Sequence, residues 1–343
     1  MALTRQSLRH GFRVFLLTWL IFVGLPLSAF AQLGGKPEKT NFTVSYTQAS
    51  GAFTPLWVAQ EAGLFKKYGL DASLKILNSQ VAHQALVAGE LDVIATGPEL
   101  VNARLQGVPV KFIGGTLQRF VFQLWGGKGI KSLADLKGKT IGVTTPKTST
   151  EIATREALKK TAVISEKDVN FTYLQTIPAI LTAVMNGNTA GGTLSAPNTL
   201  KARDAGLTLL IDIAQTNVPG FHLAWGTTEK TIKASPNSLY AFLKAVAEAT
   251  ALAKQNSPIA KKAIAKYTDT DDAKIIDGTY EQFSPYWDAA LAVHSEPIQG
   301  QLSYLDEKEF PRVKDARPAD FIDNSFADYL KSSGFLQGLG LTK

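Results

Sequence analysis

The chain has 343 residues, of which 45% are hydrophobic and 19% charged, and it contains no cysteine. This apolar content suffices for a large core and about two domains, and it excludes an intrinsically disordered chain. The absence of cysteine excludes disulfides, thiolate catalysis, zinc–thiolate sites and lipid attachment at a cysteine. The formal net charge is +7, but no lysine- and arginine-rich block with interleaved aromatic residues occurs, so we expect no nucleic-acid partner.

The first 31 residues have the features of a cleavable secretory signal peptide. Three arginines precede an apolar run over residues 14–27, and an Ala-Phe-Ala motif at 29–31 stands directly before Gln32. The alternative is a membrane anchor, but the run is short for a span, which needs about 20 residues, and Pro26 interrupts it. Without the three arginines, the mature chain carries a net charge of +4. We therefore expect export and a protein that is free in the periplasm.

Short strand-like segments alternate with helical ones after residues 32–40, which we expect to form a flexible leader. The patterns predict strands at 42–46, 72–77, 91–96 and 109–115, and helices at 54–68, 80–89 and 98–107. The alternation restarts after Gly127, with strands at 140–145, 169–174, 191–196 and 207–214 and helices at 149–160, 177–187 and 198–206. From Ser235 onward the pattern is mainly helical. Such alternation predicts an α/β fold with mostly parallel sheets flanked by helices.

Two segments of the chain resemble each other. Residues 85–110 line up with residues 183–209 when one residue is inserted. The matched pairs are Gly89 with Gly187, Pro98 with Pro197, Arg104 with Arg203 and Gly107 with Gly206. Solenoid repeats span roughly 20–50 residues, so this much longer period indicates two similar lobes, with chance similarity of two βα units as the alternative. Ligands of such sheets bind beyond the C-terminal ends of the strands, near helix N-termini, so two facing lobes predict one cleft for a small solute.

Four segments of the chain resemble a known family. They are TPLWVAQEAGLFKKYGLDASL (54–74), VAGELDVIATGP (87–98), IKSLADLKGKTIGV (130–143) and IPAILTAVMNG (177–187). In this order they are similar to ABC-transporter substrate-binding proteins of the sulfonate/nitrate/thiamine-pyrimidine type, and the resemblance extends over about residues 42–335. The chain departs from the family at residues 186–192, where the second Gly-x-x-Asp segment has no acid. The resemblance therefore implies the fold more strongly than the ligand.

The resemblance implies a type II periplasmic binding protein, with two lobes joined by a two-crossing hinge. We expect lobe I at residues 41–127 and 222–343, lobe II at 128–221, and crossings near residues 125–128 and 219–222. A hinge needs backbone freedom at a few positions, which Gly126, Gly127, Gly129 and Gly220 would supply. An ordinary turn is the alternative explanation for Gly129.

Candidate ligand-binding residues follow the predicted strands of lobe I. Ser50 and Thr54 lie in the first loop, where capping of the next helix is the alternative role for one of them. Gly97 would allow a solute close to the backbone. Glu99 either complements the dipole of its helix or faces the cleft, where it would disfavour a simple oxyanion and favour an N–H donor. Gln118 is a candidate amide donor in the third loop.

The facing loop of lobe II, at residues 145–150, contains several hydroxyls before a predicted helix. Thr148 and Ser149 are the candidates there, because hydroxyls beside free helix N–H groups form a small anion-binding nest. One of the two is also expected to cap the helix, which is the purely structural interpretation. Arg119 of lobe I could clamp a carboxylate or sulfonate, with a solvated surface charge as the alternative.

Four further candidates complete the predicted site. Ser195 and Asn198 occupy the loop of lobe II that the internal repeat matches to the one containing Gly97, and Phe221 and His222 lie at the return crossing. A hydrogen-bonded structural role is the alternative for His222. The histidines are not spaced as a metal-binding pair, so we expect no metal and no cofactor.

These features predict an extracytoplasmic solute-binding component of an ABC importer. It would capture a small polar organic solute (sulfonate, nitrate, carboxylate or pyrimidine-like) as a monomer and deliver it to a permease in the inner membrane. Nucleophile-elbow, zinc-protease and P-loop motifs are absent from the sequence, so we expect no catalytic residues. The alternatives are an enzyme of the same fold acting on a small heteroaromatic or carboxylated substrate, and the soluble partner of a sensor.

Overall fold

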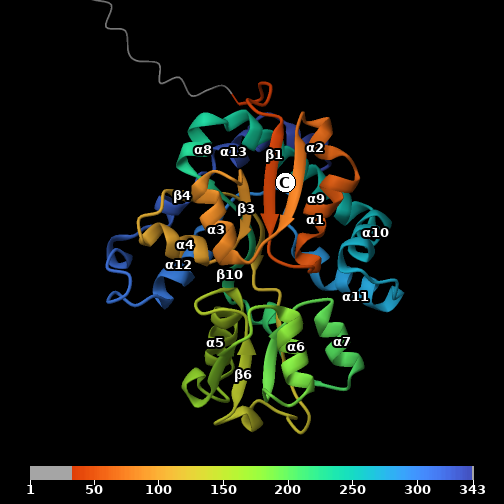
Figure 1. The fold of residues 1–343 in the computed structure, drawn as a ribbon, viewed down its shortest axis with the longest axis vertical. Coiled ribbons are helices and arrows are strands. Elements are labelled where there is room, and N and C mark those ends of the chain that lie inside the picture. Colours follow the sequence, from red (N-terminus) through yellow and green to blue (C-terminus); the bar gives the residue numbers. More distant parts are fainter. Residues whose placement is uncertain (1–32, 342–343) are drawn as a thin grey trace, which may run out of the picture. The chain divides into compact units, whose positions relative to one another are not determined.

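Two five-stranded sheets organise the computed structural model, which describes residues 33–341 (Figure 1). The first sheet has the strand order β2-β1-β3-β10-β4 and the second has the order β7-β6-β8-β5-β9. The strands of the first sheet are β1 (Asn41–Tyr46), β2 (Asp71–Ile76), β3 (Val93–Thr96), β4 (Val110–Arg119) and β10 (Pro219–Thr228). Those of the second are β5 (Gln123–Gly126), β6 (Thr140–Val143), β7 (Asn170–Tyr173), β8 (Gly191–Leu194) and β9 (Thr208–Asp212). The predicted signal peptide lies outside the described residues.

Helices cover both faces of the first sheet and flank the second. The helices of lobe I are α1 (Thr54–Glu61), α2 (Leu64–Lys67), α3 (Ser79–Ala88), α4 (Glu99–Leu105), α8 (Glu229–Ala234), α9 (Pro236–Gln255), α10 (Ser257–Thr268), α11 (Ala273–Phe283), α12 (Ser295–Tyr304), α13 (Ser325–Ser332) and α14 (Phe335–Gly338). Lobe II has α5 (Ser149–Thr161), α6 (Ile177–Met185) and α7 (Asn198–Asp204). In Figure 1, α3, α4 and α12 lie on one side of the first sheet and α1, α10 and α11 on the other. The predicted α/β fold is confirmed.

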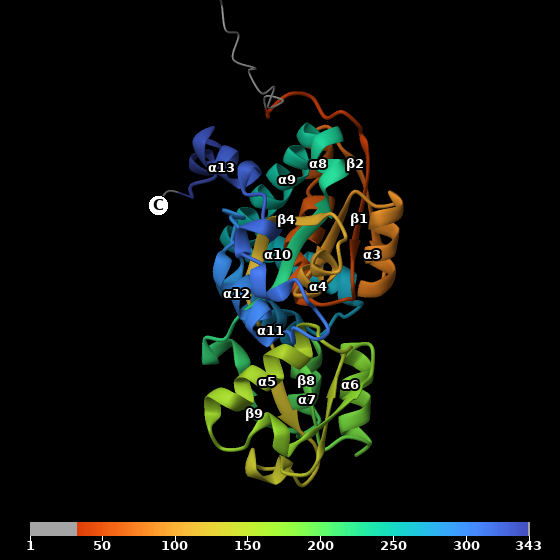
Figure 2. The ribbon, with the colours of Figure 1, turned by 90° about the vertical axis from the view of Figure 1, so that its left-hand side faces the viewer.

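The two sheets have the same topology. In each, four strands run in one direction and the fifth, β10 or β5, runs antiparallel to both of its neighbours. Each antiparallel strand is the one that the chain forms after crossing from the other lobe, which Figure 2 shows from the side. Strand β1 therefore corresponds to β6, and β3 corresponds to β8. This correspondence confirms the prediction of two similar lobes.

The internal repeat predicted from the sequence is a real structural repeat. Gly89 and Gly187 follow α3 and α6 with backbone φ angles of +83° and +74°, and Gly107 and Gly206 follow α4 and α7 with +95° and +73°. Left-handed φ angles favour glycine because a Cβ atom would be strained there. Helices α4 and α7 are both seven residues long.

The crossings between the lobes differ from the prediction. Residues 123–126, expected in lobe I, form β5 and pair with β8 and β9 of lobe II. Residues 219–221, expected in lobe II, belong to β10, in which Pro219 pairs with Arg119. The first crossing therefore lies at 120–122, and the second precedes Pro219. Both crossing strands escaped prediction because their pairing partners are distant in sequence and no helix follows β5 to complete a βα unit.

The hinge glycines also have different roles from those expected. Gly126 belongs to β5 and Gly127 directly follows it, so both are within lobe II. A Cβ atom on Gly220 would lie 2.0 Å from the ring of Phe120, so this glycine permits close packing of the two crossing segments. Gly129 has a φ angle of +87°, which fits the alternative of an ordinary turn.

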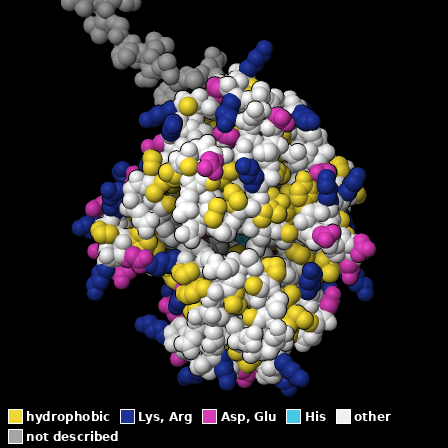
Figure 3. Space-filling view, viewed as in Figure 1, with side chains coloured by type: hydrophobic (Ala, Val, Ile, Leu, Met, Phe, Trp, Pro, Cys, Tyr) yellow, Lys and Arg dark blue, Asp and Glu magenta, His cyan; other side chains and the backbone are white. Residues whose placement is uncertain are grey.

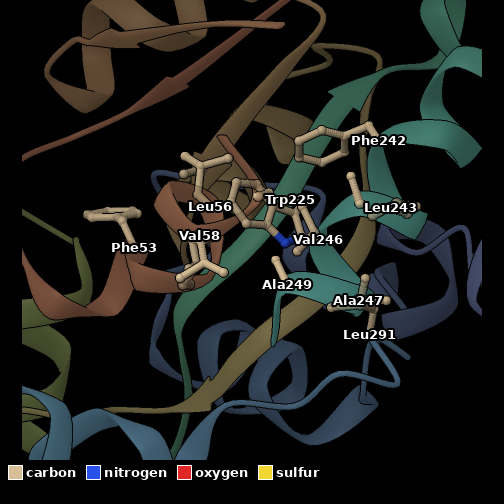
Figure 4. Packing of buried hydrophobic residues seen from close by; sticks show 14 of the residues in the cluster. Phe53, Leu56, Val58, Trp225, Phe242, Leu243, Val246, Ala247, Ala249 and Leu291 are labelled. Atoms are coloured by element: carbon tan, nitrogen blue, oxygen red, sulfur yellow. The ribbon is translucent and has the colours of Figure 1, made fainter. Parts of the chain in front are cut away.

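The largest apolar cluster lies in lobe I, where α1 and α9 pack on the sheet (Figure 4). Phe242 of α9 stacks on Phe42 at 5.6 Å between ring centroids and meets Trp225 of β10 edge-on at 5.2 Å. The predicted helix 54–68 is divided into α1 and α2 at Gly63, whose φ angle of +67° ends the first helix. The long strand β10 is therefore packed into this core, between its neighbours β3 and β4.

The segment 33–40, expected to be flexible, makes specific contacts with lobe I. The carboxylate of Glu38 accepts hydrogen bonds from the backbone N–H groups of Asn237 and Ser238 at 3.0 and 2.9 Å, and Lys39 pairs with Asp92 at 2.7 Å. Burial acts to raise the pKa of Glu38, but these hydrogen bonds outweigh burial and hold the pKa below its ordinary value. The first turn of α9 binds this carboxylate because its N–H groups have no partners within the helix.

Candidate ligand-binding site

A cavity of about 1030 Å³ opens between the two lobes. It appears in Figure 3 as a hollow with a histidine side chain visible inside it. The residues that line it come from the ends of β1, β2 and β3 and from β10 in lobe I, and from the ends of β6 and β7 in lobe II. This is the edge at which ligands of open α/β sheets bind.

The loop between β3 and α4 contributes Gly97 and Glu99 to the cavity wall. The Oε1 atom of Glu99 accepts a hydrogen bond from the Ser79 hydroxyl at 3.0 Å, and its Oε2 atom is buried without a partner among residues 33–341. The first N–H groups of α4 are bound by backbone carbonyls, with Leu100 N donating to Gly97 O at 3.2 Å. The Glu99 carboxylate therefore does not cap its own helix.

The loop between β6 and α5 contributes Thr148 and Ser149 from the other side. Thr148 occupies the N-cap position of α5, but its hydroxyl donates to the Thr145 carbonyl at 2.9 Å and makes no capping bond. The Ser149 hydroxyl donates to the Phe221 carbonyl at 3.2 Å. The expectation that one of these hydroxyls caps the helix is wrong, because nearby carbonyls bind both of them.

A buried carboxylate already occupies part of the predicted anion-binding nest. Glu151 accepts a hydrogen bond from the Lys147 backbone N–H at 2.7 Å and pairs with Arg155 at 2.7 Å. Only 3% of Glu151 is exposed. The negative charge expected near the N-terminus of α5 is thus supplied by the protein itself.

His222 lies in the wall of the cavity and stacks on Phe122 with 4.1 Å between ring centroids. Its Nδ1 atom accepts a hydrogen bond from the Val121 backbone N–H at 3.1 Å, so the neutral ring carries its proton on Nε2. Burial lowers the pKa of His222 to about 3. The ring is therefore neutral near pH 7 and provides one N–H donor.

The structure brings five of the eleven sequence candidates into the cavity wall. They are Gly97, Glu99, Thr148, Ser149 and His222. The other six lie outside it, namely Ser50, Thr54, Gln118, Ser195, Asn198 and Phe221.

Several of the six make contacts that explain their position. Ser50 and Ser195 are buried, with their hydroxyl oxygens 3.4 Å apart at a contact between the lobes. The Thr54 hydroxyl donates to the Gly51 carbonyl at 2.8 Å. Gln118 binds the Ala292 carbonyl at 2.7 Å, because β4 is the edge strand and its end lies away from the cleft.

The remaining candidates have structural roles as well. Asn198 is buried at the start of α7, and its N–H donates to the Ser195 carbonyl at 3.0 Å. Phe221 packs on Phe112 with 4.6 Å between ring centroids, although its carbonyl meets Ser149. The Arg119 guanidinium binds the Ala214 carbonyl and the Asn217 side chain, so it does not form the predicted clamp in the cleft.

Sequence reasoning missed the loops after β2 and β7. They bring Ser79 and His83 of α3, and Gln175 and Thr176 of lobe II, into the cavity wall. The His83 Nδ1–H donates to the Ser79 carbonyl at 2.8 Å, and its Nε2 atom lies 3.4 Å from the Thr96 hydroxyl oxygen. The sequence contained the information needed to predict these residues. Both segments follow predicted strands, and ligands of α/β sheets bind beyond the C-terminal ends of the strands.

Comparison with known proteins identifies the family. A sequence profile described as NMT1/THI5 like matches residues 50–258, which is more than half of the chain. The chain belongs to the NMT1/THI5-like family. The matched region contains every strand of both lobes except β1, and it includes all five cavity-lining candidates.

Relatives of this chain are described as candidate binding proteins. Proteins from Brucella abortus and Brucella suis are 34% identical over 132 residues, which is 38% of this chain and 39% of each relative. The chain therefore matches well under half of the length of these relatives.

Solved structures with the same fold include solute-binding proteins. The alkanesulfonate-binding protein SsuA from Xanthomonas axonopodis pv. citri has a TM-score of 0.69 at 17% identity, over 84% of this chain and 99% of that chain. The periplasmic nitrate-binding protein NrtA from Synechocystis PCC 6803 has a TM-score of 0.71 at 16% identity, over 90% of this chain and 91% of that chain. These matches confirm the type II periplasmic binding protein fold. Between residues 33 and 341, none of the helices combines the length and the apolar character that crossing a bilayer requires.

Proposed function

We propose that this NMT1/THI5-like protein is the extracytoplasmic solute-binding component of an ABC importer. It captures a small polar organic solute between its lobes and passes the solute unchanged to a permease in the inner membrane. The predicted signal peptide supports export to the periplasm, and the sulfonate- and nitrate-binding proteins of the same fold support the role in import.

The observation that carries the proposal is the cavity of about 1030 Å³ lined from both lobes. This volume is at the upper end of the range for small-molecule sites, which is about 300–1,000 Å³. A solute that touches both lobes stabilises the closed arrangement by its cross-cleft contacts, so capture and lobe closure are coupled. Coupled capture and closure are sufficient for a binding protein, whereas an enzyme would also have to convert the solute chemically.

Binding is tested by thermal unfolding of residues 32–343 in a library of polar metabolites. A true ligand at 100 times its Kd stabilises the folded protein by about 2.7 kcal/mol. Small-angle scattering of the same samples is expected to give a smaller radius of gyration with the ligand than without it. Absence of any stabilising solute would contradict the proposal, and recovery of a chemically altered solute would favour an enzyme.

A further inference from the structure

The formal charge in the wall of the cavity is negative. Among the described residues that line it, Glu99 is the only one with a formal charge at neutral pH, and no lysine or arginine contributes to the wall. Lys147 lies in the loop 145–150, but its ammonium group pairs with Glu309 and lies 5.3 Å from the centre of the Phe310 ring. The cavity therefore offers a free anion no cationic partner and presents a carboxylate to it.

The Glu99 carboxylate is prepared to accept a further hydrogen bond. Its Oε1 atom binds the Ser79 hydroxyl at 3.0 Å, whereas the buried Oε2 atom has no partner in the part of the chain that the structure describes. A Cβ atom on Gly97 would lie 3.2 Å from this Oε2 and 2.7 Å from the Ser149 hydroxyl oxygen, so Oε2 lies beside the contact between the two lobes. A buried carboxylate oxygen without a donor costs free energy, and a bound N–H group would recover that cost through a charge-assisted hydrogen bond.

Other groups in the wall complete the pattern expected for a nitrogen-containing solute. The Nε2–H of neutral His222 is a donor with no partner among residues 33–341. The hydroxyls of Thr144 and Thr150 bind each other at 2.7 Å. Near the start of α5, the buried Glu151 carboxylate accepts a hydrogen bond from the Lys147 backbone N–H of the same loop and adds a second negative charge on this side of the cavity.

Resting on the proposed function, we infer that the captured solute presents an amine or a ring or exocyclic N–H group to Glu99. A solute whose polar groups are only sulfonate, nitrate or carboxylate is disfavoured, because its charge would lie near Glu99 and no lysine or arginine of the wall would act as counter-ion. An acceptor atom elsewhere on the same solute meets the His222 Nε2–H. The inferred ligand is thus cationic or neutral at the end that contacts Glu99.

The test uses residues 32–343 and a metabolite library with two arms. Members of the first arm carry an amine, amidine or heteroaromatic N–H group, and members of the second carry only sulfonate, nitrate or carboxylate groups. Thermal shift identifies the ligands, and calorimetry gives their Kd values for the wild type, Glu99→Gln and Glu90→Gln. Glu90 is an exposed acid of the same lobe that does not line the cavity, so its variant is the matched control for loss of one charge.

We expect ligands in the first arm only. Glu99→Gln is expected to raise their Kd about 10- to 100-fold, because a hydrogen bond to a charged group is lost, and Glu90→Gln is expected to leave Kd unchanged. Glu99→Asp retains the charge and is expected to retain the preference for N–H solutes, which provides a second test if Glu99→Gln unfolds.

Two outcomes separate this inference from the proposed function. Tight binding of ethanesulfonate or nitrate with equal Kd in the wild type and Glu99→Gln would overturn the inferred ligand class, while the solute-binding function would stand. Failure of the wild type to bind any member of either arm would overturn the proposed function and the inference with it.

Discussion

Two of the contacts between the lobes are made equivalent by the common topology. In the first, the Gly51 N–H and the Ser50 hydroxyl, both after β1, donate to the Ala196 carbonyl after β8, each at 3.3 Å. In the second, Gly97 after β3 meets Ser149 after β6, where a Cβ atom on Gly97 would lie 2.7 Å from the Ser149 hydroxyl oxygen. Because β1 corresponds to β6 and β3 to β8, each contact joins the same pair of loops with the lobes exchanged.

The two contacts nevertheless serve different purposes. Ser50, Gly51 and Ala196 are buried and lie outside the cavity, so their contact joins the lobes beside it. Gly97 and Ser149 line the cavity, so a solute bound there touches both sides of their contact. Of two equivalent contacts, one is therefore structural and the other is part of the candidate site.

The largest expected effect is on stability, from Gly51→Ala in the first contact. The added Cβ atom would lie 2.4 Å from Thr279 and 2.7 Å from Phe283, both inside lobe I. Overpacking of this kind is expected to lower the free energy of unfolding by about 3 kcal/mol, measured by equilibrium urea denaturation. A loss below about 1 kcal/mol would show that α11 yields easily and that the first contact is not tightly packed.

The same substitution in the second contact is expected to act on binding. Gly97→Ala places its methyl group against Ser149 of the other lobe, so it hinders closure and is expected to weaken solute affinity about 10-fold in calorimetry. Ser149→Ala in the same chain removes the nearest atom and is expected to restore part of the affinity. Equal loss of affinity with and without Ser149→Ala would contradict this explanation.

The free energy of unfolding is also expected to depend on pH, because of His222, which lies beside the second contact. Its pKa in the folded protein, about 3, is below the ordinary value of 6.5, so the unfolded chain binds a proton that the folded chain does not. Stability is therefore expected to fall as pH decreases from about 6.5 towards 3, with a limiting contribution of about 1.4 kcal/mol per pH unit. His222→Gln is expected to reduce the slope of unfolding free energy against pH. An unchanged slope would show that this imidazole accepts a proton in the folded state.

The smallest expected effects come from the two serine hydroxyls. Ser50→Ala removes hydrogen bonds of 3.3 Å to Ala196 O and 3.4 Å from Ala52 N, and it is expected to lower the free energy of unfolding by about 0.5–1 kcal/mol. Ser149→Ala is expected to change stability by less, because Ser149 is partly exposed in the cavity wall and its hydroxyl makes one hydrogen bond, to the Phe221 carbonyl. Urea denaturation of both variants under identical conditions measures the difference, and a larger loss for Ser149→Ala would reverse the roles given to the two contacts.

Much of the fold was predictable because local patterns specified it. Helix α6 has Thr176 as its N-cap, proline in its first turn and Gly187 after its end, so its bounds follow from the chain alone. The site was predictable only in part. Glu99 and Ser149 follow predicted strands and line the cavity. Gln118 also followed a predicted strand, but in the structure it lies within β4, the edge strand of its sheet, and does not line the cavity.

The sequence by itself determined the alternation of strands and helices, the internal repeat and the resemblance to a solute-binding family, because each depends on neighbours in the chain. Only the tertiary structure decided the positions of β5 and β10, since an antiparallel strand between distant partners has no local signature. It also decided which strand ends surround the cavity and that the Glu99 Oε2 atom has no partner within the described residues. Strand order and the approach of the two lobes place these atoms together, and both arise from packing between residues far apart in the sequence.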